Sequence, residues 1–266
     1  MTTLLAVIAW SLIWLTLLFQ LFKTHDQPTP LLLQTKWLKP LTFIALAAHG
    51  LSLLWLMRTP EGLALNFNLT ASLVMWITNL LLLIAQLKRP VQSLSLFTLP
   101  LTLISLVIQL LPQPIGVVSL DDGLGIHIIT SLLAYSMLTL AAFQALLLSI
   151  QNHYLHKRQH TLILKSLPPL LDMEDLLFRL ILIGVILLTL GLMTGFIYLT
   201  DLFAQHVAHK TILSLIAWFI FTTLLIGHWH YGWRGRIAIR WTLIGSVILM
   251  LGFLGSKFII EYLVKN

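Results

Sequence analysis

The sequence has no cysteine and very little charge. Without cysteine the chain can form no disulfide, no Cys-ligated zinc or iron–sulfur site, no thioredoxin-like pair and no Cys-x-x-Cys-His attachment motif, which leaves histidine as the main soft ligand. Only 9% of its 266 residues are charged, against about 25% in an ordinary globular domain. Hydrophobic residues make up 58% and the mean hydropathy is +0.95, so the outer surface must face lipid and a water-soluble fold is excluded.

Long apolar runs dominate the chain. A bilayer core of about 30 Å is crossed by about 20 apolar residues in a helix, and eight runs of suitable length occur. The first is a full span long, lacks a basic segment before it and is followed by Lys23, so we expect a helix and not a signal peptide. The sequence predicts an all-α fold, a polytopic membrane helix bundle of eight transmembrane helices that forms a single integral membrane domain over residues 1–266. The runs are approximately 3–22, 40–57, 67–87, 94–111, 124–150, 176–200, 211–230 and 239–263.

Basic residues gather in alternate connections between the runs. Arg58 and Lys210 lie in the connections of one side, whereas the connections of the other side hold eleven basic residues. By the positive-inside rule the side rich in basic residues is cytoplasmic, so both termini are predicted outside. The net charge of +7 therefore reports orientation, and we expect no nucleic-acid partner. The eleven residues are Lys23, Lys36, Lys39, Lys88, Arg89, Lys157, Arg158, Lys165, Arg234, Arg236 and Arg240.

Charged residues are almost absent from the interior of the runs. Lys257 and Glu261 lie near the outer end of the last run and Arg179 lies at the start of the sixth, where long side chains reach the interface or pair. A carrier coupled to protons or sodium usually needs a carboxylate deep in the membrane, so secondary transport is disfavoured. We also expect no enzymatic activity.

Three histidines lie within or at the ends of the apolar runs. His49 is in the middle of the second run with no local charge partner, and an imidazole there costs free energy unless it is hydrogen-bonded or bound to a ligand. His228 lies at the cytoplasmic end of the seventh run, and His127 opens the fifth run from the outer side, with Ser131 and Tyr135 on the same helical face. Each also has a structural explanation: a bond to a neighbouring helix, an interfacial position beside tryptophans, or an ordinary boundary residue.

The longest connection, residues 151–175, is predicted to be cytoplasmic. Its run Ser166-Leu-Pro-Pro breaks any helix, and Asp172 resembles a helix cap with Asp175 in the first turn that follows. Three histidines at i, i+3 and i+7 favour a solvated helix face over a metal site. They are His153, His156 and His160.

Glycines in two of the later runs favour close helix packing. The pattern Gly191-x-x-x-Gly195, preceded by Gly184, lets another helix approach closely. A second stripe of small residues consists of Gly245, Gly252 and Gly255.

Three segments of the second half resemble a known family. They are Met173–Gly195, the segment from Lys210 through Trp218 and His228 to Gly235, and His127-Ile-Ile-Thr-Ser131-Leu-Leu-Ala-Tyr135. These segments are similar to the core of the cytochrome c assembly protein family, the CcsA/CcmC-like haem-handling membrane proteins. The match is good over residues 124–260, and eight spans without a large extra domain look most like its HemX/YpjD branch.

The resemblance implies roles for the three histidines. It implies that His49 and His228 are a transmembrane pair of axial ligands to haem b, and that His127 faces haem on the outer side. It also implies a bacterial inner membrane location, with membrane lipid, haem and other cytochrome-maturation or haem-biosynthesis proteins as partners. Residues 198–209 lack the tryptophans of the family's haem exporters, so haem handling is implied and export is left open. The alternative is a regulatory or structural membrane protein of the HemX kind that acts through a protein partner without haem.

Depth along the helices separates His127 from the other two. At a rise of about 1.5 Å per residue, His127 lies at least about 10 Å in depth from His49, too far for both to ligate one iron. We therefore expect His127 to serve a separate outer station. His206 or His209 is its candidate partner from the same outer side.

Overall fold

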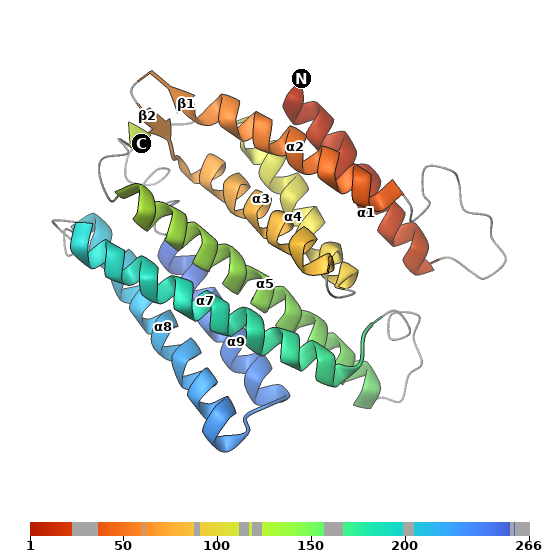
Figure 1. The fold of residues 1–266 in the computed structure, drawn as a ribbon, viewed down its shortest axis with the longest axis vertical. Coiled ribbons are helices and arrows are strands. Elements are labelled where there is room, and N and C mark those ends of the chain that lie inside the picture. Colours follow the sequence, from red (N-terminus) through yellow and green to blue (C-terminus); the bar gives the residue numbers. More distant parts are fainter. Residues whose placement is uncertain are drawn as a thin grey trace.

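Helices make up most of the structure, a computed structural model (Figure 1). It describes residues 1–22, 37–60, 62–87, 91–111, 117–118, 124–156, 167–198, 205–255 and 258. In chain order the elements are α1 (Thr2–Phe22), α2 (Leu38–Met57), β1 (Arg58–Thr59), β2 (Gly62–Ala64), α3 (Phe67–Gln86), the 3-10 turn η3 (Gln92–Leu94), α4 (Ser95–Ile108), β3 (Val117–Val118), α5 (Leu124–His156), α7 (Leu170–Tyr198), α8 (Gln205–Tyr231), α9 (Arg236–Met250) and the π-helical turn η4 (Leu251–Gly255).

The prediction of an all-α, polytopic membrane bundle is confirmed. Seven of the helices are long and apolar enough to cross a membrane, and a shorter apolar helix covers Gln92–Ile108. A helix therefore lies in each of the eight predicted runs. The shortest of these helices, α4, has 14 residues and contains Pro100. The number of crossings and the side on which the termini lie stay predictions.

Two groups of helices lie side by side in Figure 1. One consists of α1 to α4 and the other of α5, α7, α8 and α9, and α3 packs against α5 where the groups meet. The hydroxyl of Ser136 on α5 donates to the carbonyl of Val74 on α3 at 3.3 Å. The rings of Phe97 on α4 and Phe143 on α5 stack with centroids 6.3 Å apart. One apolar core lies within α1 to α4, and a larger one joins α5, α7, α8 and α9 to Val74 and Leu82 of α3. Close packing must hold the helices together, because lipid does not drive them to associate.

Small residues set the contact between α5 and α7. A Cβ atom added at Gly184 would lie 2.5 Å from Leu138, and one at Gly191 would lie 3.1 Å from the hydroxyl of Ser131. The predicted close approach along this glycine stripe is therefore confirmed. The second stripe is confirmed at two of its positions, where Gly245 and Gly252 of the last helix meet side chains of α8.

The start of α7 differs from the sequence prediction. The helix begins at Leu170, directly after Pro168 and Pro169, so Asp172 lies in its first turn and is not the cap. The carbonyl of Pro169 accepts the backbone N–H groups of Asp172 and Met173. Proline suits the first residues of a helix, where the missing N–H has no intrahelical partner. Asp172 still lies where the helix dipole favours an acid.

A small antiparallel sheet closes one end of the α1–α4 group and was not predicted. Its strand order is β1-β2-β3, with Arg58 opposite Leu63 and Leu63 opposite Val118. The strands have only two or three residues each, too short for period-two patterning to show in the sequence.

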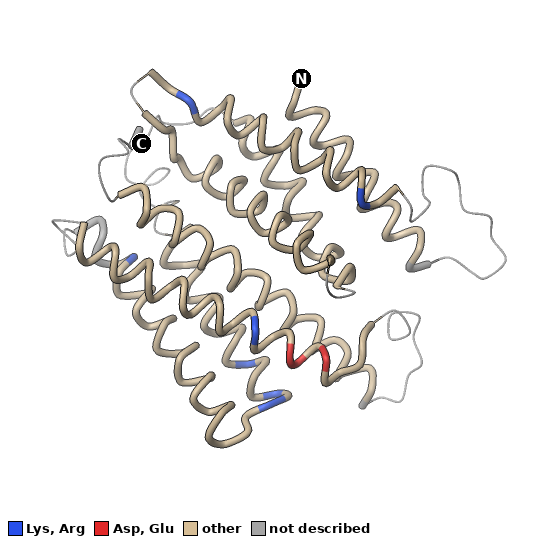
Figure 2. The backbone as a smooth tube through the Cα atoms, in the orientation of Figure 1, with Lys and Arg blue, Asp and Glu red and all other residues tan. Residues whose placement is uncertain are grey.

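Described charges gather at one end of the molecule (Figure 2). Arg58 in β1 and Lys210 near the start of α8 are the described basic residues at the end where α5 begins, which is the predicted outer end. The opposite, predicted cytoplasmic end has five: Lys39, Arg179, Arg234, Arg236 and Arg240. Arg179 pairs there with Asp175 at 3.0 Å. This distribution agrees with the positive-inside prediction among the residues that the structure describes.

Candidate functional site

A pocket lies between four helices near the start of α5. Its walls come from α5, α7, α8 and the last helix with its π-helical turn, and its free volume is about 70 Å³. Most of the lining is apolar: Leu188, Gly191, Leu192, Gly195, Phe196, Leu249 and Phe253. The polar lining consists of His127, Ser131, Tyr135, Lys210, Thr211 and Ser214.

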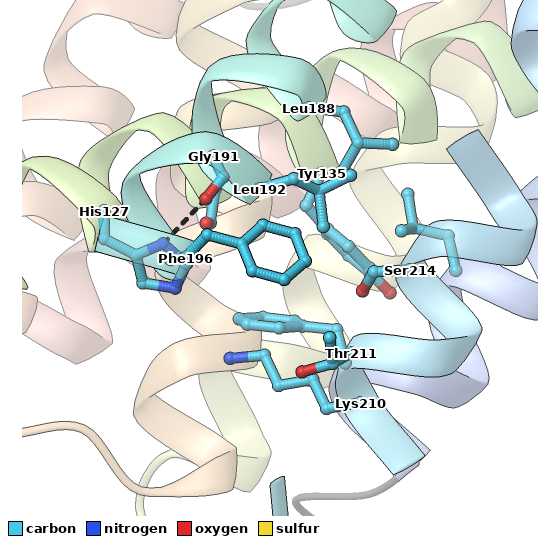
Figure 3. Close-up of a pocket in the computed structure, with 13 residues that line it drawn as sticks. His127, Tyr135, Leu188, Gly191, Leu192, Phe196, Lys210, Thr211 and Ser214 are labelled. Atoms are coloured by element: carbon cyan, nitrogen blue, oxygen red, sulfur yellow. Dashed lines mark hydrogen bonds between the residues drawn. The ribbon is translucent and has the colours of Figure 1, made fainter. Parts of the chain in front are cut away.

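His127 is held in one orientation at the wall of this pocket (Figure 3). Its Nδ1–H donates to the backbone carbonyl of Gly191 at 2.9 Å. Because a carbonyl only accepts, this bond places the proton of the neutral ring on Nδ1 and leaves the lone pair on Nε2. A backbone carbonyl behind one ring nitrogen is the usual support of a metal-binding imidazole. The close approach of α5 and α7 at Gly191 makes this bond possible.

The face of α5 below His127 continues the pocket. Ser131 and Tyr135, predicted to lie on the same face as His127, both line it. The Tyr135 ring lies against Phe253 of the π-helical turn, with centroids 5.0 Å apart. The prediction of a shared face is confirmed.

Lys210 completes the pocket and was not recognised as a site residue from the sequence. It was expected in a connection, but it lies inside α8, which begins at Gln205. Its Nζ lies 5.0 Å from the centre of the Phe253 ring. The available signal was a lysine at the head of an apolar run, on the side of the chain with few basic residues.

His49 lies elsewhere, in a buried polar network of the α1–α4 group. Its side chain is fully buried, and its Nε2 lies 2.9 Å from the hydroxyl of Ser72 on α3. Ser72 donates its own proton to Gln109 at 2.8 Å, so it accepts from His49. Gln109 in turn donates to Ser52, which bonds Thr3 of α1. The imidazole thus ties neighbouring helices together, and its buried Nδ1 has no hydrogen-bond partner among the described residues.

His228 lies near the end of α8 against aromatic residues. Its Nδ1–H donates to the carbonyl of Trp233 at 3.0 Å. Its ring stacks on Phe178 of α7 with centroids 3.5 Å apart. Trp233 packs in turn on Trp241 with centroids 5.4 Å apart, and Trp229 is exposed. This setting is typical of a membrane interface, and it leaves Nε2 as the ring nitrogen with the lone pair.

The structure does not bring His49 and His228 together. Helix α2 packs on α1 and α3, whereas α8 packs on α7 and α9. In Figure 1, α2 and α8 lie on opposite sides of the molecule, with α3, α5 and α7 between them. Ligation of one iron by both residues therefore requires another arrangement of the helices, and the predicted pair stays a prediction.

The described side chains of the other histidines do not line the pocket. His209 and His153 are exposed, and His153 fits the predicted solvated face. The side chains of His156 and His206, and all of His160, lie outside the described residues. Within the described parts, no three His, Asp or Glu side chains form a group that could hold a metal ion.

Comparison with known proteins decides the family. The model of the family described as cytochrome C assembly protein matches residues 37–264. The chain belongs to the cytochrome c assembly protein family. The match extends well beyond the predicted region of 124–260 toward the N-terminus and includes α2 and His49.

Relatives of this cytochrome c assembly protein cover only part of it. Over 137 residues it is 40% identical to "Inner membrane protein YpjD" of Escherichia coli (strain K12), 52% of either chain. It is 32% identical over 140 residues, again 52% of either chain, to an uncharacterized 28.8 kDa protein of Azospirillum brasilense. It is 30% identical over 91 residues to "Cytochrome c biogenesis protein CcsA" of Gloeobacter violaceus, 34% of this chain and 27% of that one. The chain thus spans about half the length of the first curated relatives it matches. No solved structure matches.

The residues of the pocket fit the haem that family membership implies. His127 offers an imidazole nitrogen with a free lone pair and a supported second nitrogen, which is the arrangement of an axial ligand. Phe196, Tyr135 and Phe253 offer aromatic walls. The free volume of about 70 Å³ is smaller than a porphyrin, so entry requires movement of wall residues, and Phe196 is half exposed at 49%.

Proposed function

We propose that this cytochrome c assembly protein is an inner-membrane, haem-handling protein that binds haem b at the pocket beside His127. The observation that carries the proposal is the His127 imidazole, fixed by the Gly191 carbonyl with its free nitrogen on the pocket side. Bound haem would supply a redox-active iron whose properties depend on the axial ligand and its surroundings. Binding would be non-covalent, because the chain has no cysteine. The proposed role is non-enzymatic.

Different residues of the pocket would ligate the iron, orient the ligating ring and exclude water. His127 would ligate, while the Gly191 carbonyl keeps its ring from rotating. Tyr135 and Phe253, whose rings lie against each other, would form an aromatic wall that excludes water. The outer position of the pocket follows from the predicted orientation. Partners would be membrane lipid and other proteins of cytochrome maturation or haem biosynthesis.

His127 is better placed to act as an axial ligand of haem iron than the predicted pair of His49 and His228. Each of the three rings keeps one nitrogen without a protein hydrogen bond among the described residues, so each could bind iron. Only His127 lines the pocket described above. His49 is fully buried in a network that serves helix packing. A second haem held by His49 and His228 is a separate proposal, and it requires rearrangement of the bundle.

The test is the absorption spectrum of the full chain purified from a membrane and titrated with haem. We expect a Soret band that His127→Ala weakens strongly, while His49→Ala and His228→Ala keep it. His153→Ala, an exposed histidine outside the pocket, is the matched control. A bis-imidazole spectrum lost only in the His49 and His228 variants would contradict this site and favour the transmembrane pair.

The small free volume supports a second candidate. A protein that acts through a protein partner without haem, in a regulatory or structural role, needs no porphyrin-sized space. If folded protein shows no spectrum of bound haem even with haem in excess, this alternative is favoured.

A further inference from the structure

Lys210 presents a positive charge to the pocket, and no described acidic residue lies beside it. The three described acidic residues are Asp172, Glu174 and Asp175. All three lie in the first two turns of α7, whereas the pocket meets α7 from Leu188 to Phe196. The described ion pair joins Arg179 to Asp175 in the first part of α7, away from the part of α7 that lines the pocket with Lys210. Among the described residues, the ammonium group therefore contacts the face of the Phe253 ring and no carboxylate.

An ammonium group in such a position favours an anionic ligand. Lys210 is half-buried in a span, His209–Tyr231, that holds no other Lys, Arg, Asp or Glu. A cation at the edge of a membrane is costly unless it reaches water, an aromatic face or an opposite charge. The Phe253 ring orients the ammonium at 5.0 Å, but it leaves the donors of the ammonium free to bond oxygen.

The ammonium and the free nitrogen of His127 share one space. Figure 3 shows the ring nitrogen that does not bond Gly191 on the same side as the Lys210 ammonium. Both residues line the one pocket, with Tyr135 and Phe253 as its aromatic wall. The pocket thus combines a neutral metal ligand, an aromatic wall and a cation. This combination suits an amphipathic ligand with a metal centre and a carboxylate at its edge.

We infer that Lys210 is the anion-recognising residue of this pocket and pairs with a carboxylate of the ligand, which is a haem propionate if the proposed function holds. The inference rests on the proposed function for the identity of the ligand. Lysine provides a compact point charge on a flexible stem, so it can follow a flexible propionate chain. His127 would then fix the iron, and Lys210 would fix the orientation of the macrocycle in the pocket.

The experiment compares haem with haem dimethyl ester, which keeps the iron and the macrocycle but has no carboxylate charge. Both are titrated into the purified full chain, followed by the Soret band and by quenching of the fluorescence of its nine tryptophans. The wild-type protein should bind haem about tenfold more tightly than the ester, the scale of one charged hydrogen bond. Lys210→Met should remove this preference by weakening haem and leaving the ester unchanged. Lys210→Arg should retain part of it.

Matched variants separate a charge effect from a fold effect. Lys39→Met removes an exposed lysine at the opposite end of the bundle and should leave both affinities unchanged. If Lys210→Met weakens haem and ester equally, Lys210 supports the pocket only structurally and the inference is wrong. Equal affinity of the wild-type protein for both ligands, with both weakened by His127→Ala, would overturn the role of Lys210 and leave the proposed function standing. Binding of neither ligand would overturn the proposed function and the inference with it.

Discussion

The carboxylate of Glu174 accepts a hydrogen bond from the backbone N–H of Gly235 at 2.9 Å. Glu174 is 7% exposed, so this bond joins the start of α7 to the turn before α9 in a nearly dry place. Gly235 has φ +56° and ψ −124°, a conformation that glycine alone adopts readily. This bond therefore helps to fix the turn from which α9 starts.

Glu174→Ala is expected to lower the free energy of unfolding by about 1 to 3 kcal/mol, because the Gly235 N–H loses its acceptor where water is scarce. Glu174→Gln should cost less, since its amide oxygen can still accept. The measurement is thermal loss of helical circular dichroism in detergent. Asp172→Ala, an exposed acid of the same helix turn, is the control. Equal effects at both positions would show that the bond to Gly235 contributes nothing.

Gly235→Ala is expected to cost about 1 to 3 kcal/mol through backbone strain alone. A Cβ atom there would meet only the Glu174 carboxylate at 3.8 Å, so crowding adds nothing. Gly255→Ala, where a Cβ atom would make ordinary contacts from 3.6 Å, should be nearly neutral. The measurement is again thermal loss of helical circular dichroism in detergent. If Gly235→Ala leaves the stability unchanged, the expected backbone strain at this turn is absent.

Gly184→Ala is expected to destabilise the contact of α5 with α7 by about 1 to 3 kcal/mol, because the new methyl group would lie 2.5 Å from Leu138. Leu138→Ala alone should cost about 2 to 5 kcal/mol through the cavity that it leaves. The double variant should cost less than the sum by about 0.5 kcal/mol or more. Strict additivity in this double-mutant cycle would mean that the two residues do not touch.

Ser72→Ala is expected to destabilise the α1–α4 group by about 1 to 3 kcal/mol, because His49 and Gln109 would both lose their partner. Adding His49→Leu to this variant should restore part of the loss, since the unpaired imidazole is then gone. The haem spectrum of the double variant should match the wild-type spectrum. A changed spectrum would return His49 to the role of ligand.

The predicted orientation can be mapped by single cysteines, because the chain has none of its own. Lys36→Cys and Arg158→Cys are at predicted cytoplasmic positions, so they should react with a membrane-impermeant maleimide only after the membrane is permeabilised. A reporter fused after Asn266 should score as external. Reaction of Arg158→Cys in intact cells would reverse the orientation.

The architecture of this bundle could be predicted because lipid imposes simple rules on sequence. Span length and the scarcity of charge can be read from each segment alone, and the structure has long apolar helices in these segments. The close approach of helices at Gly184 and Gly191 could likewise be read from the spacing of the glycines. The same holds for the face of α5 that carries His127, Ser131 and Tyr135, since a helix repeat alone aligns them.

The predicted partners of the histidines depend on tertiary arrangement, which no local pattern encodes. His49 and His228 were joined by resemblance, but the order in which helices pack places α3, α5 and α7 between their helices. The sequence predicted Lys210 in a connection because its apolar run was predicted to begin at residue 211, whereas α8 begins at Gln205. The Ser72 and Gln109 partners of His49 come from two further helix segments and carry no signal of their own.

Phe253, the ring beneath the Lys210 ammonium, lies at the centre of the π-helical turn Leu251–Gly255. Such a turn holds more residues than an α-helical turn of the same helix. Removing one residue from it would return the turn to α-helical pitch and would carry the Phe253 ring off the face that meets Lys210 and Tyr135. The shape of the pocket is therefore set by how many residues the turn contains as well as by which ones, so a scan of substitutions would miss a determinant that a single-residue deletion would reveal.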